Sequence, residues 1–143
     1  MNKEALLICP VCKEELKPAE KSYLCKNGHC FDIAKSGYVN LLQINHKKTK
    51  NPGDDKEMIL ARKHFLDLGY FEKLRNKIYE IIKDYSPATI LDAGCGSGYY
   101  TNKLENEFQV ISVDISKSAA DVTAKNNKQS TVDRKSTRLN SSH

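Results

Sequence analysis

The chain has 143 residues, of which 39% are hydrophobic and 29% charged, with a formal net charge of +5 at pH 7. This composition is typical of an ordinary globular chain with one modest domain or two small ones, and it excludes overall disorder and a collagen-like fibre. No run approaches the roughly 18 apolar residues of a membrane span, and the start lacks the apolar stretch of a secretory signal. The cytoplasm is therefore the expected compartment, and the modest charge does not by itself establish a nucleic-acid partner.

Four of the five cysteines and one histidine lie in the segment CPVCKEELKPAEKSYLCKNGHC, which begins at Cys9. In a reducing compartment, clustered cysteines bind metal or act in redox chemistry more often than they form disulfides. Two thiolates separated by two residues, here Cys9 and Cys12, can reach one zinc ion from a tight turn, and a second turn completes a tetrahedral site. That second turn begins at Cys25, and either His29 or Cys30 could supply its last ligand.

Two other interpretations of the cluster remain open at this point. A thioredoxin-like redox pair would need a surrounding βαβ pattern, which is absent around Cys9 and Cys12. Buried cysteines without a chemical role are the other alternative. The twelve residues between Cys12 and Cys25 are enough for two short strands between the turns. The spacing favours zinc.

The segment FDIAKSGYVNLLQ predicts two short apolar strands with a turn at residues 35–37. Their apolar side chains would pack on a core too small to be stable without its metal; they are Phe31, Ile33, Tyr38, Val39 and Leu41. The periodicity then ends in a charged stretch containing His46, Lys47, Lys48 and Lys50. This stretch is either an exposed linker or a segment that contacts phosphate groups.

Two helices are expected after the charged stretch. Asp54, with Glu57 three residues later, predicts the start of the first helix, and Gly69 predicts its end. The second helix is amphipathic and stops at Ser86 and Pro87. Its apolar side chains at helical spacing are expected to be core; they are Phe71, Leu74, Ile78, Ile81 and Ile82.

The segment TILDAGCGSGYYTNKLENEFQVISVDIS carries the parts of a nucleotide-binding βαβ unit. A buried strand over 89–91 leads into a turn with glycines at 94, 96 and 98, then a helix and a second strand over 110–113. Glycines in such a turn let the backbone approach a ligand closely. Asp114, at the end of the second strand, is placed to accept hydrogen bonds from ribose hydroxyls.

The spacing of the glycines separates two classes of cofactor. A dinucleotide fingerprint reads G-x-G-x-x-G. Here the pattern from Asp92 to Gly98 is D-x-G-x-G-x-G, which resembles motif I of the class I S-adenosylmethionine methyltransferases. A dinucleotide site and a purely structural turn are the alternatives. Cys95, inside the loop, is expected to be a packing residue rather than a nucleophile.

Five segments, taken together, indicate a family: CPVC, YLCKNGHCFDIAKSGYVNLL, HKKTKNPGDDKEMILARKHFLDLGYF, ILDAGCGSGYYT and VDISK. Over roughly residues 8 to 120 the chain resembles the RlmA/RrmA family of bacterial 23S ribosomal RNA (guanine-N1)-methyltransferases, which includes the tylosin-resistance methyltransferases. The resemblance implies an α/β fold in which an N-terminal zinc-ribbon-like module precedes a class I (Rossmann-like) methyltransferase domain. It also implies zinc and S-adenosylmethionine as cofactors.

The resemblance carries over residue by residue. The family's C-x-x-C and C-x-x-x-H pattern falls on Cys9, Cys12, Cys25 and His29, which would leave Cys30 outside the site. The cofactor would contact Gly94, Gly96, Ser97 and Gly98, with Asp114 on its ribose and Phe71 helping to close the pocket. The zinc module and the basic linker would recognise a hairpin of 23S ribosomal RNA, no membrane is involved, and the full-length protein is expected to form a homodimer.

The end of the chain departs from the family. The sheet of a complete methyltransferase domain has more strands than the two predicted here, and the substrate-pocket motif is missing, so no catalytic base is assigned. The last residues, KQSTVDRKSTRLNSSH, have almost nothing to bury. RKSTRLNSSH resembles translated adapter or vector sequence, with a natural disordered tail as the alternative. We therefore expect an enzyme interrupted around residue 130 and inactive in this form.

The predicted organisation has four parts. Residues 1–45 form the zinc-binding RNA-recognition module, 46–86 the basic linker and two helices, 87–132 the truncated S-adenosylmethionine-binding domain, and 133–143 a foreign or disordered tail. One alternative function is a stand-alone zinc-dependent RNA-binding module without catalysis. Another is a redox or metal-handling protein.

Overall fold

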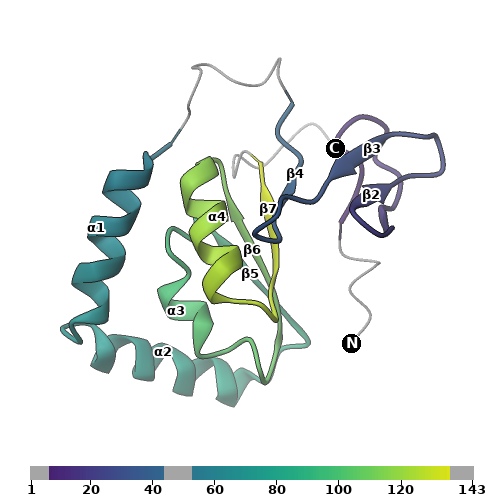
Figure 1. Cartoon of the computed structure of the whole chain (residues 1–143). Coiled ribbons are helices and arrows are strands. Elements are labelled where there is room, and N and C mark those ends of the chain that lie inside the picture. The colour runs from purple at the N-terminus through teal and green to yellow at the C-terminus, as the bar shows by residue number, and fades with distance from the viewer. Residues whose placement is uncertain (1–6, 44–52, 136–143) are drawn as a thin grey trace.

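A computed structural model describes residues 7–43 and 53–135 (Figure 1). The predicted basic stretch from His46 to Lys50 and the last part of the predicted tail lie outside the described residues. The larger sheet has four parallel strands in the order β4-β7-β6-β5. They are β4 (Val39–Asn40), β7 (Thr131–Arg134), β6 (Gln109–Asp114) and β5 (Thr89–Ala93).

A small antiparallel sheet lies near the N-terminus, and we call residues 7–32 the ribbon module. Its strands are β1 (Lys17–Pro18), β2 (Ser22–Leu24) and β3 (Cys30–Asp32), in the order β1-β2-β3. β1 and β2 are the two short strands expected between Cys12 and Cys25. The chain then turns at Gly37, which has a φ of +113°, and continues into β4. β4 leaves the ribbon module and pairs with β7 of the larger sheet.

The larger sheet has α4 (Lys117–Asn126) on one face and the ribbon module against part of the other face (Figure 1). On one face, α4 packs Ala120 and Ala124 against Val132 of β7. On the other face, Ile111 and Val113 of β6 share one core cluster with the ribbon module. The ribbon module therefore does not have a core of its own, although the sequence suggested a separate module ending at residue 45.

The first helix, α1 (Lys56–Asp67), begins one residue later than predicted. Its N-cap is Asp55, whose side chain accepts a hydrogen bond from the Met58 amide at 2.9 Å. Asp54, the predicted cap, forms an ion pair with Arg62 at 2.6 Å. At the other end Gly69 has a φ of +98° and follows the last turn, as expected.

The second helix, α2 (Glu72–Tyr85), ends at Ser86, as predicted, but the expectation that its apolar side chains form core is wrong. No residue of α2 is buried; Ile78 and Ile82 are half-buried, and Leu74 and Ile81 are exposed. Its contacts are instead polar: Lys103 donates to the side chain of Asn76 at 2.5 Å, and Tyr79 donates to Glu107. By contrast, α1 buries Ile59 against α4.

The polar segment near the C-terminus is also more ordered than predicted. Thr131–Arg134 forms β7, and all of its residues are buried. The predicted tail from residue 133 therefore begins inside the sheet. The reason is that a strand edge offers unpaired N–H and C=O groups to any backbone, so β6 accepts a neighbour whatever its side chains. Among the described residues, no helix is long and apolar enough to cross a membrane.

Candidate metal centre and cofactor loop

Two tight turns present the predicted metal ligands. In the first turn, the Cys9 amide donates to the Glu14 carbonyl at 2.7 Å, and the Lys13 amide donates to the Cys9 carbonyl at 2.8 Å. The second turn joins β2 to β3, and the Cys25 amide donates to the His29 carbonyl at 3.1 Å. Gly28 has a φ of +85° there, a conformation that residues with a side chain rarely adopt.

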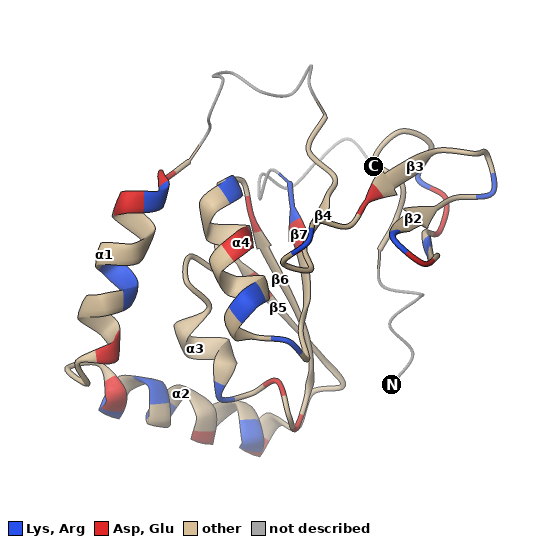
Figure 2. Ribbon diagram, in the orientation of Figure 1, with Lys and Arg blue, Asp and Glu red and all other residues tan. Residues whose placement is uncertain are grey.

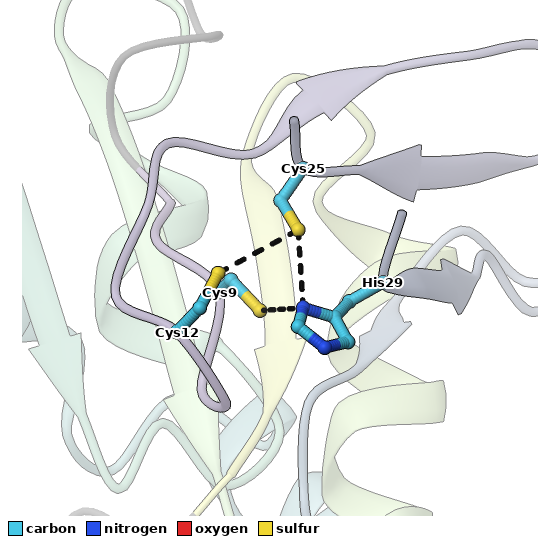
Figure 3. A group of neighbouring side chains, drawn as sticks. All are labelled: Cys9, Cys12, Cys25 and His29. Atoms are coloured by element: carbon cyan, nitrogen blue, oxygen red, sulfur yellow. Dashed lines mark hydrogen bonds between the residues drawn. The ribbon is translucent and has the colours of Figure 1, made fainter. Parts of the chain in front are cut away.

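The turns bring four donor atoms, from Cys9, Cys12, Cys25 and His29, within 4.8 Å of one another (Figure 3). The sulfurs of Cys12 and Cys25 are 3.7 Å apart, and His29 Nδ1 lies 3.5 Å from Cys9 Sγ and 3.2 Å from Cys25 Sγ. Tetrahedral zinc with ordinary bond lengths would separate two sulfurs by about 3.8 Å and a sulfur from a nitrogen by about 3.6 Å. The group therefore fits the size of a zinc site.

Cys30 does not belong to this group. It is exposed on β3, and all five cysteines are free thiols. His29 and Cys30 were the two alternatives for the last donor. The structure brings His29 to the three clustered cysteines and leaves Cys30 outside the group.

The environments of the first two thiols differ. A hydrogen bond with the Asn27 side chain, followed by one with the Glu14 backbone, lowers the pKa of Cys12 to about 6. Burial raises the pKa of Cys9. A low thiol pKa is found in both metal and redox sites. The convergence of Cys25 and His29 on the same point favours metal, because a redox pair would need only the first two cysteines.

The glycine-rich loop connects β5 to α3 (Tyr99–Asn102), and its three glycines have positive φ angles for different reasons. A Cβ on Gly94 or Gly96 would meet no atom within 4 Å. A Cβ on Gly98 would lie 2.5 Å from the Asn127 side chain. The first two glycines therefore face open space that a ligand can enter, whereas Gly98 is required by packing.

Asp114 is tied to this loop. One of its carboxylate oxygens accepts a hydrogen bond from the Gly96 amide at 3.0 Å, and the other accepts from the Ser116 amide at 2.9 Å. Ser116 in turn donates to the backbone carbonyl of Asp54. Each carboxylate oxygen has a further lone pair, so Asp114 can still accept from ribose hydroxyls.

Sequence reasoning missed two residues that hold the loop, Thr123 of α4 and Asn127, which caps the C-terminus of α4. The Thr123 hydroxyl donates to the Gly96 carbonyl at 2.9 Å, and the Asn127 amide donates to the Gly98 carbonyl at 3.0 Å. Both side chains are buried. The available signal was their spacing, since polar residues four apart lie on the same face of a helix.

Two residues at the start of the motif are buried beside the loop. Asp92 accepts a hydrogen bond from the Thr101 hydroxyl at 2.9 Å, and burial, reinforced by the charge of Asp114, raises its pKa. Burial also raises the pKa of Cys95 to about 12, and its sulfur lies 3.5 Å from the Thr123 hydroxyl. Such a thiol stays protonated at neutral pH and is a poor nucleophile, which agrees with a packing role.

Comparison with known proteins agrees with both halves of this arrangement. The family model of the N-terminal zinc ribbon of RlmA matches residues 7–50, and a methyltransferase domain matches residues 90–141. The chain belongs to the RlmA-type methyltransferase family. The methyltransferase domain implies S-adenosylmethionine as cofactor, and the zinc ribbon implies zinc.

Three curated relatives of this RlmA-type chain illustrate the match. A 23S rRNA (guanine(748)-N(1))-methyltransferase of Streptomyces fradiae is 33% identical over 107 residues, covering 72% of this chain and 37% of the relative. A putative 23S rRNA (guanine-N(1)-)-methyltransferase of Bacillus subtilis is 35% identical over 103 residues, covering 67% and 35%. A putative enzyme of the same name from Micromonospora griseorubida is 43% identical over 70 residues, covering 46% and 23%. The chain thus spans about a third of the length of the first two relatives.

Not every predicted cofactor residue of this RlmA-type chain lies at the same place. A cavity beside the loop is lined by Ser97 and Gly98, but not by Asp114. Phe71 does not line it either; its ring packs edge-on against Phe65, with the ring centroids 5.9 Å apart. The structure therefore brings the glycines and Asp114 together and leaves Phe71 at the corner between α1 and α2.

Proposed function

We propose that the chain is part of an enzyme that transfers a methyl group from S-adenosylmethionine to N1 of a guanine in 23S ribosomal RNA. One observation carries the proposal: a four-donor Cys/His group packs directly on the sheet that ends in the glycine loop. The names of the relatives supply the reaction and the base, and the comparisons supply both domain types.

In this proposal Cys9, Cys12, Cys25 and His29 hold one zinc ion. Four protein donors complete a tetrahedral shell and leave no open position for a substrate. The metal would therefore stabilise the ribbon module and take no part in the chemistry. This agrees with the packing of Cys9 and Cys25 inside the shared core.

The proposed cofactor site uses the loop after β5 and the end of β6. S-adenosylmethionine, when bound, supplies an activated methyl group. Gly94 and Gly96 leave space for its close approach, and Asp114 accepts hydrogen bonds from its ribose. Further contacts are proposed for Ser97, Gly98 and Phe71. Positioning of the methyl group against the base would provide most of the catalytic effect.

The proposed RNA partner is a hairpin of 23S ribosomal RNA, recognised by the ribbon module and the basic stretch from His46 to Lys50. The ribbon module carries charges of both signs (Figure 2). The basic stretch is therefore the proposed source of attraction to phosphates, and its affinity should fall with salt. A homodimer of the full-length protein is part of the same proposal.

A methyl-transfer assay tests the proposed function. A chimera joins this chain, up to residue 126, to the remaining part of the Bacillus subtilis relative, and it is incubated with labelled S-adenosylmethionine and unmodified 23S RNA. We expect 1-methylguanosine from the chimera and none from its Asp114→Ala variant or from the 143-residue chain alone. Methylation of a different atom would contradict the proposal. Zinc-dependent RNA binding without transfer by the chimera would favour the stand-alone RNA-binding module.

A further inference from the structure

The cavity beside the glycine loop carries charges that the proposed function has not yet used. It has a volume of about 180 Å³ and lies between the two helices α1 and α2 and the loop. Ser97 and Gly98 form the loop side of the cavity. Three asparagines also line it: Asn102 of α3, and Asn126 and Asn127 at the end of α4. From α1 come Lys63 and Asp67, and from α2 comes Arg75.

The two cations of the cavity are in different states. Lys63 forms an ion pair with Asp67 at 2.6 Å. Arg75 makes no ion pair within the described part of the chain, and its Nε is buried without a hydrogen-bond partner. Its guanidinium lies 4.4 Å from the centre of the Tyr99 ring, which holds it in place beside the loop. Because buried polar groups normally have partners, the Arg75 guanidinium is suited to bind an anionic group.

The charges on the cavity wall favour an anionic group. Asp67 is already paired with Lys63, so Arg75 is the charged group of the wall that has no ion pair among the described residues. An α-amino acid carries a carboxylate, which would pair with Arg75, and an ammonium group, which would face the carboxylate of Asp67. Arginine suits a carboxylate in particular, because its planar fork can donate two parallel hydrogen bonds.

The position of the cavity matches one end of the proposed cofactor. Gly96 contacts Asp114, the proposed ribose acceptor, and Gly98 lines the cavity two residues later. Gly96 and Gly98 are therefore at most about 7 Å apart, the length of two extended residues. S-adenosylmethionine is longer than this, so a molecule whose ribose lies at Asp114 can reach the cavity with its amino-acid end.

We propose that Arg75 binds the carboxylate of the amino-acid end of S-adenosylmethionine, with Asp67 facing the ammonium group. This assignment rests on the proposed function, since it takes the cofactor from there. Arg75 is then a determinant of cofactor specificity, located on a helix outside the glycine motif. Tyr99, at the start of α3, stacks against the guanidinium and orients it.

Calorimetric binding of two ligands to the zinc-loaded 143-residue chain tests the assignment. The ligands are S-adenosylmethionine and decarboxylated S-adenosylmethionine, which lacks only the carboxylate. We expect the wild-type chain to bind S-adenosylmethionine at least about tenfold more tightly than the decarboxylated ligand. One charge-assisted hydrogen bond contributes an increase in affinity of this size. Because this comparison needs no variant, it does not depend on how substitutions affect folding.

Three variants then locate the effect. In Arg75→Met the preference should fall to about one, while the affinity for the decarboxylated ligand stays within about twofold. Arg75→Lys keeps the charge without the fork and should give an intermediate preference. Lys77→Met is the matched control, because Lys77 is an exposed cation of the same helix that does not line the cavity, and it should behave as wild type.

The outcomes separate this inference from the proposed function. Equal binding of both ligands by the wild-type chain, or an unchanged preference in Arg75→Met, overturns the role of Arg75 and leaves the cofactor site standing. An equal loss of both ligands in Arg75→Met also overturns it, because the residue would then be structural. Failure of the wild-type chain to bind either ligand overturns the cofactor site and this assignment together.

Discussion

His29 and Cys30 are adjacent in the sequence, but their side chains lie in different environments. His29 reaches the three clustered cysteines, whereas Cys30 is exposed on β3. We predict that Cys30→Ser retains one zinc per chain and that His29→Ala lowers zinc affinity by about tenfold or more, since it removes one of four ligands. Metal analysis with a competing chelator measures both. Loss of zinc in Cys30→Ser with retention in His29→Ala would move the site to four cysteines.

Asp133 is a carboxylate at a position that suits an apolar residue. In the sheet it lies between Val39 of β4 and Val113 of β6, both members of the shared core. Its side chain is 0% exposed, and neither carboxylate oxygen has a hydrogen-bond partner. Burial raises its pKa to about 6, although Lys135 lies 3.4 Å away.

Replacing this carboxylate should stabilise the protein. The separation between the ordinary pKa of 3.8 and the value of about 6 corresponds to roughly 3 kcal/mol at pH 7. We therefore predict that Asp133→Val raises the free energy of unfolding by roughly 2–3 kcal/mol at pH 7. Urea titration measures it. Asp32→Val, at an exposed aspartate of β3, is the matched control and should change stability by no more than about 0.5 kcal/mol.

The same residue predicts a pH dependence. Between pH 3.8 and about 6 the folded state binds a proton at Asp133 that the unfolded state has released, so stability rises as the pH falls through 6. The destabilisation of the folded state by the ionised Asp133 carboxylate is complete above pH 6 and absent below pH 3.8. The advantage of Asp133→Val should therefore shrink as urea titrations move from pH 7 to pH 4. A constant difference between the two proteins would show that burial does not raise this pKa.

At the scale of elements, the ribbon module and the sheet depend on each other. From the sequence we expected chelation to unfold residues 1 to 45 and to spare the helices after Asp54. The shared core changes this prediction, because Cys9 and Cys25 pack with Ile111 and Val113 of β6. Loss of the ribbon would expose that face of β6 to water.

We predict that zinc removal increases amide hydrogen exchange in β6 and β4 as well as in residues 7–32. α1 should keep its protection, because it packs on α4 through Ile59 at the opposite face of the sheet. Mass spectrometry of exchange, with and without chelator, gives both results in one experiment. An increase in exchange confined to the ribbon module would show that the ribbon module and the larger sheet are independently stable.

At the scale of the whole molecule, β5 forms one edge of the larger sheet within the described residues. β5 is the last strand in the order, and Leu91, beside Ile111, is 61% exposed because the ribbon module does not extend over it. Unpaired edge strands with exposed apolar residues promote association. We predict concentration-dependent self-association of the chain, measured by sedimentation velocity, and its reduction by Leu91→Lys. Leu68→Lys replaces an equally exposed leucine at the end of α1 and should have no effect.

Local patterns were predictable wherever the chemistry is local. The spacing of Cys9, Cys12 and Cys25, with His29 or Cys30 as the fourth donor, was evident from the sequence, as were the glycine loop and Asp114 at the end of a strand. Helix ends at Gly69 and Ser86 were predictable for the same reason, since turns depend on a few neighbouring residues. The contacts of Thr123 and Asn127 with the loop were not, because they join residues far apart in the chain.

The sequence by itself determined the two kinds of site, because metal ligands and glycine turns are defined by residue type and short spacing. Only the tertiary structure decided how the sites are joined. It placed the cysteines of the ribbon on β6 and buried Asp133 in β7. It also left no apolar residue of α2 fully buried. Burial depends on which surfaces meet, and hydrophobic periodicity marks a face that can be buried without specifying its partner.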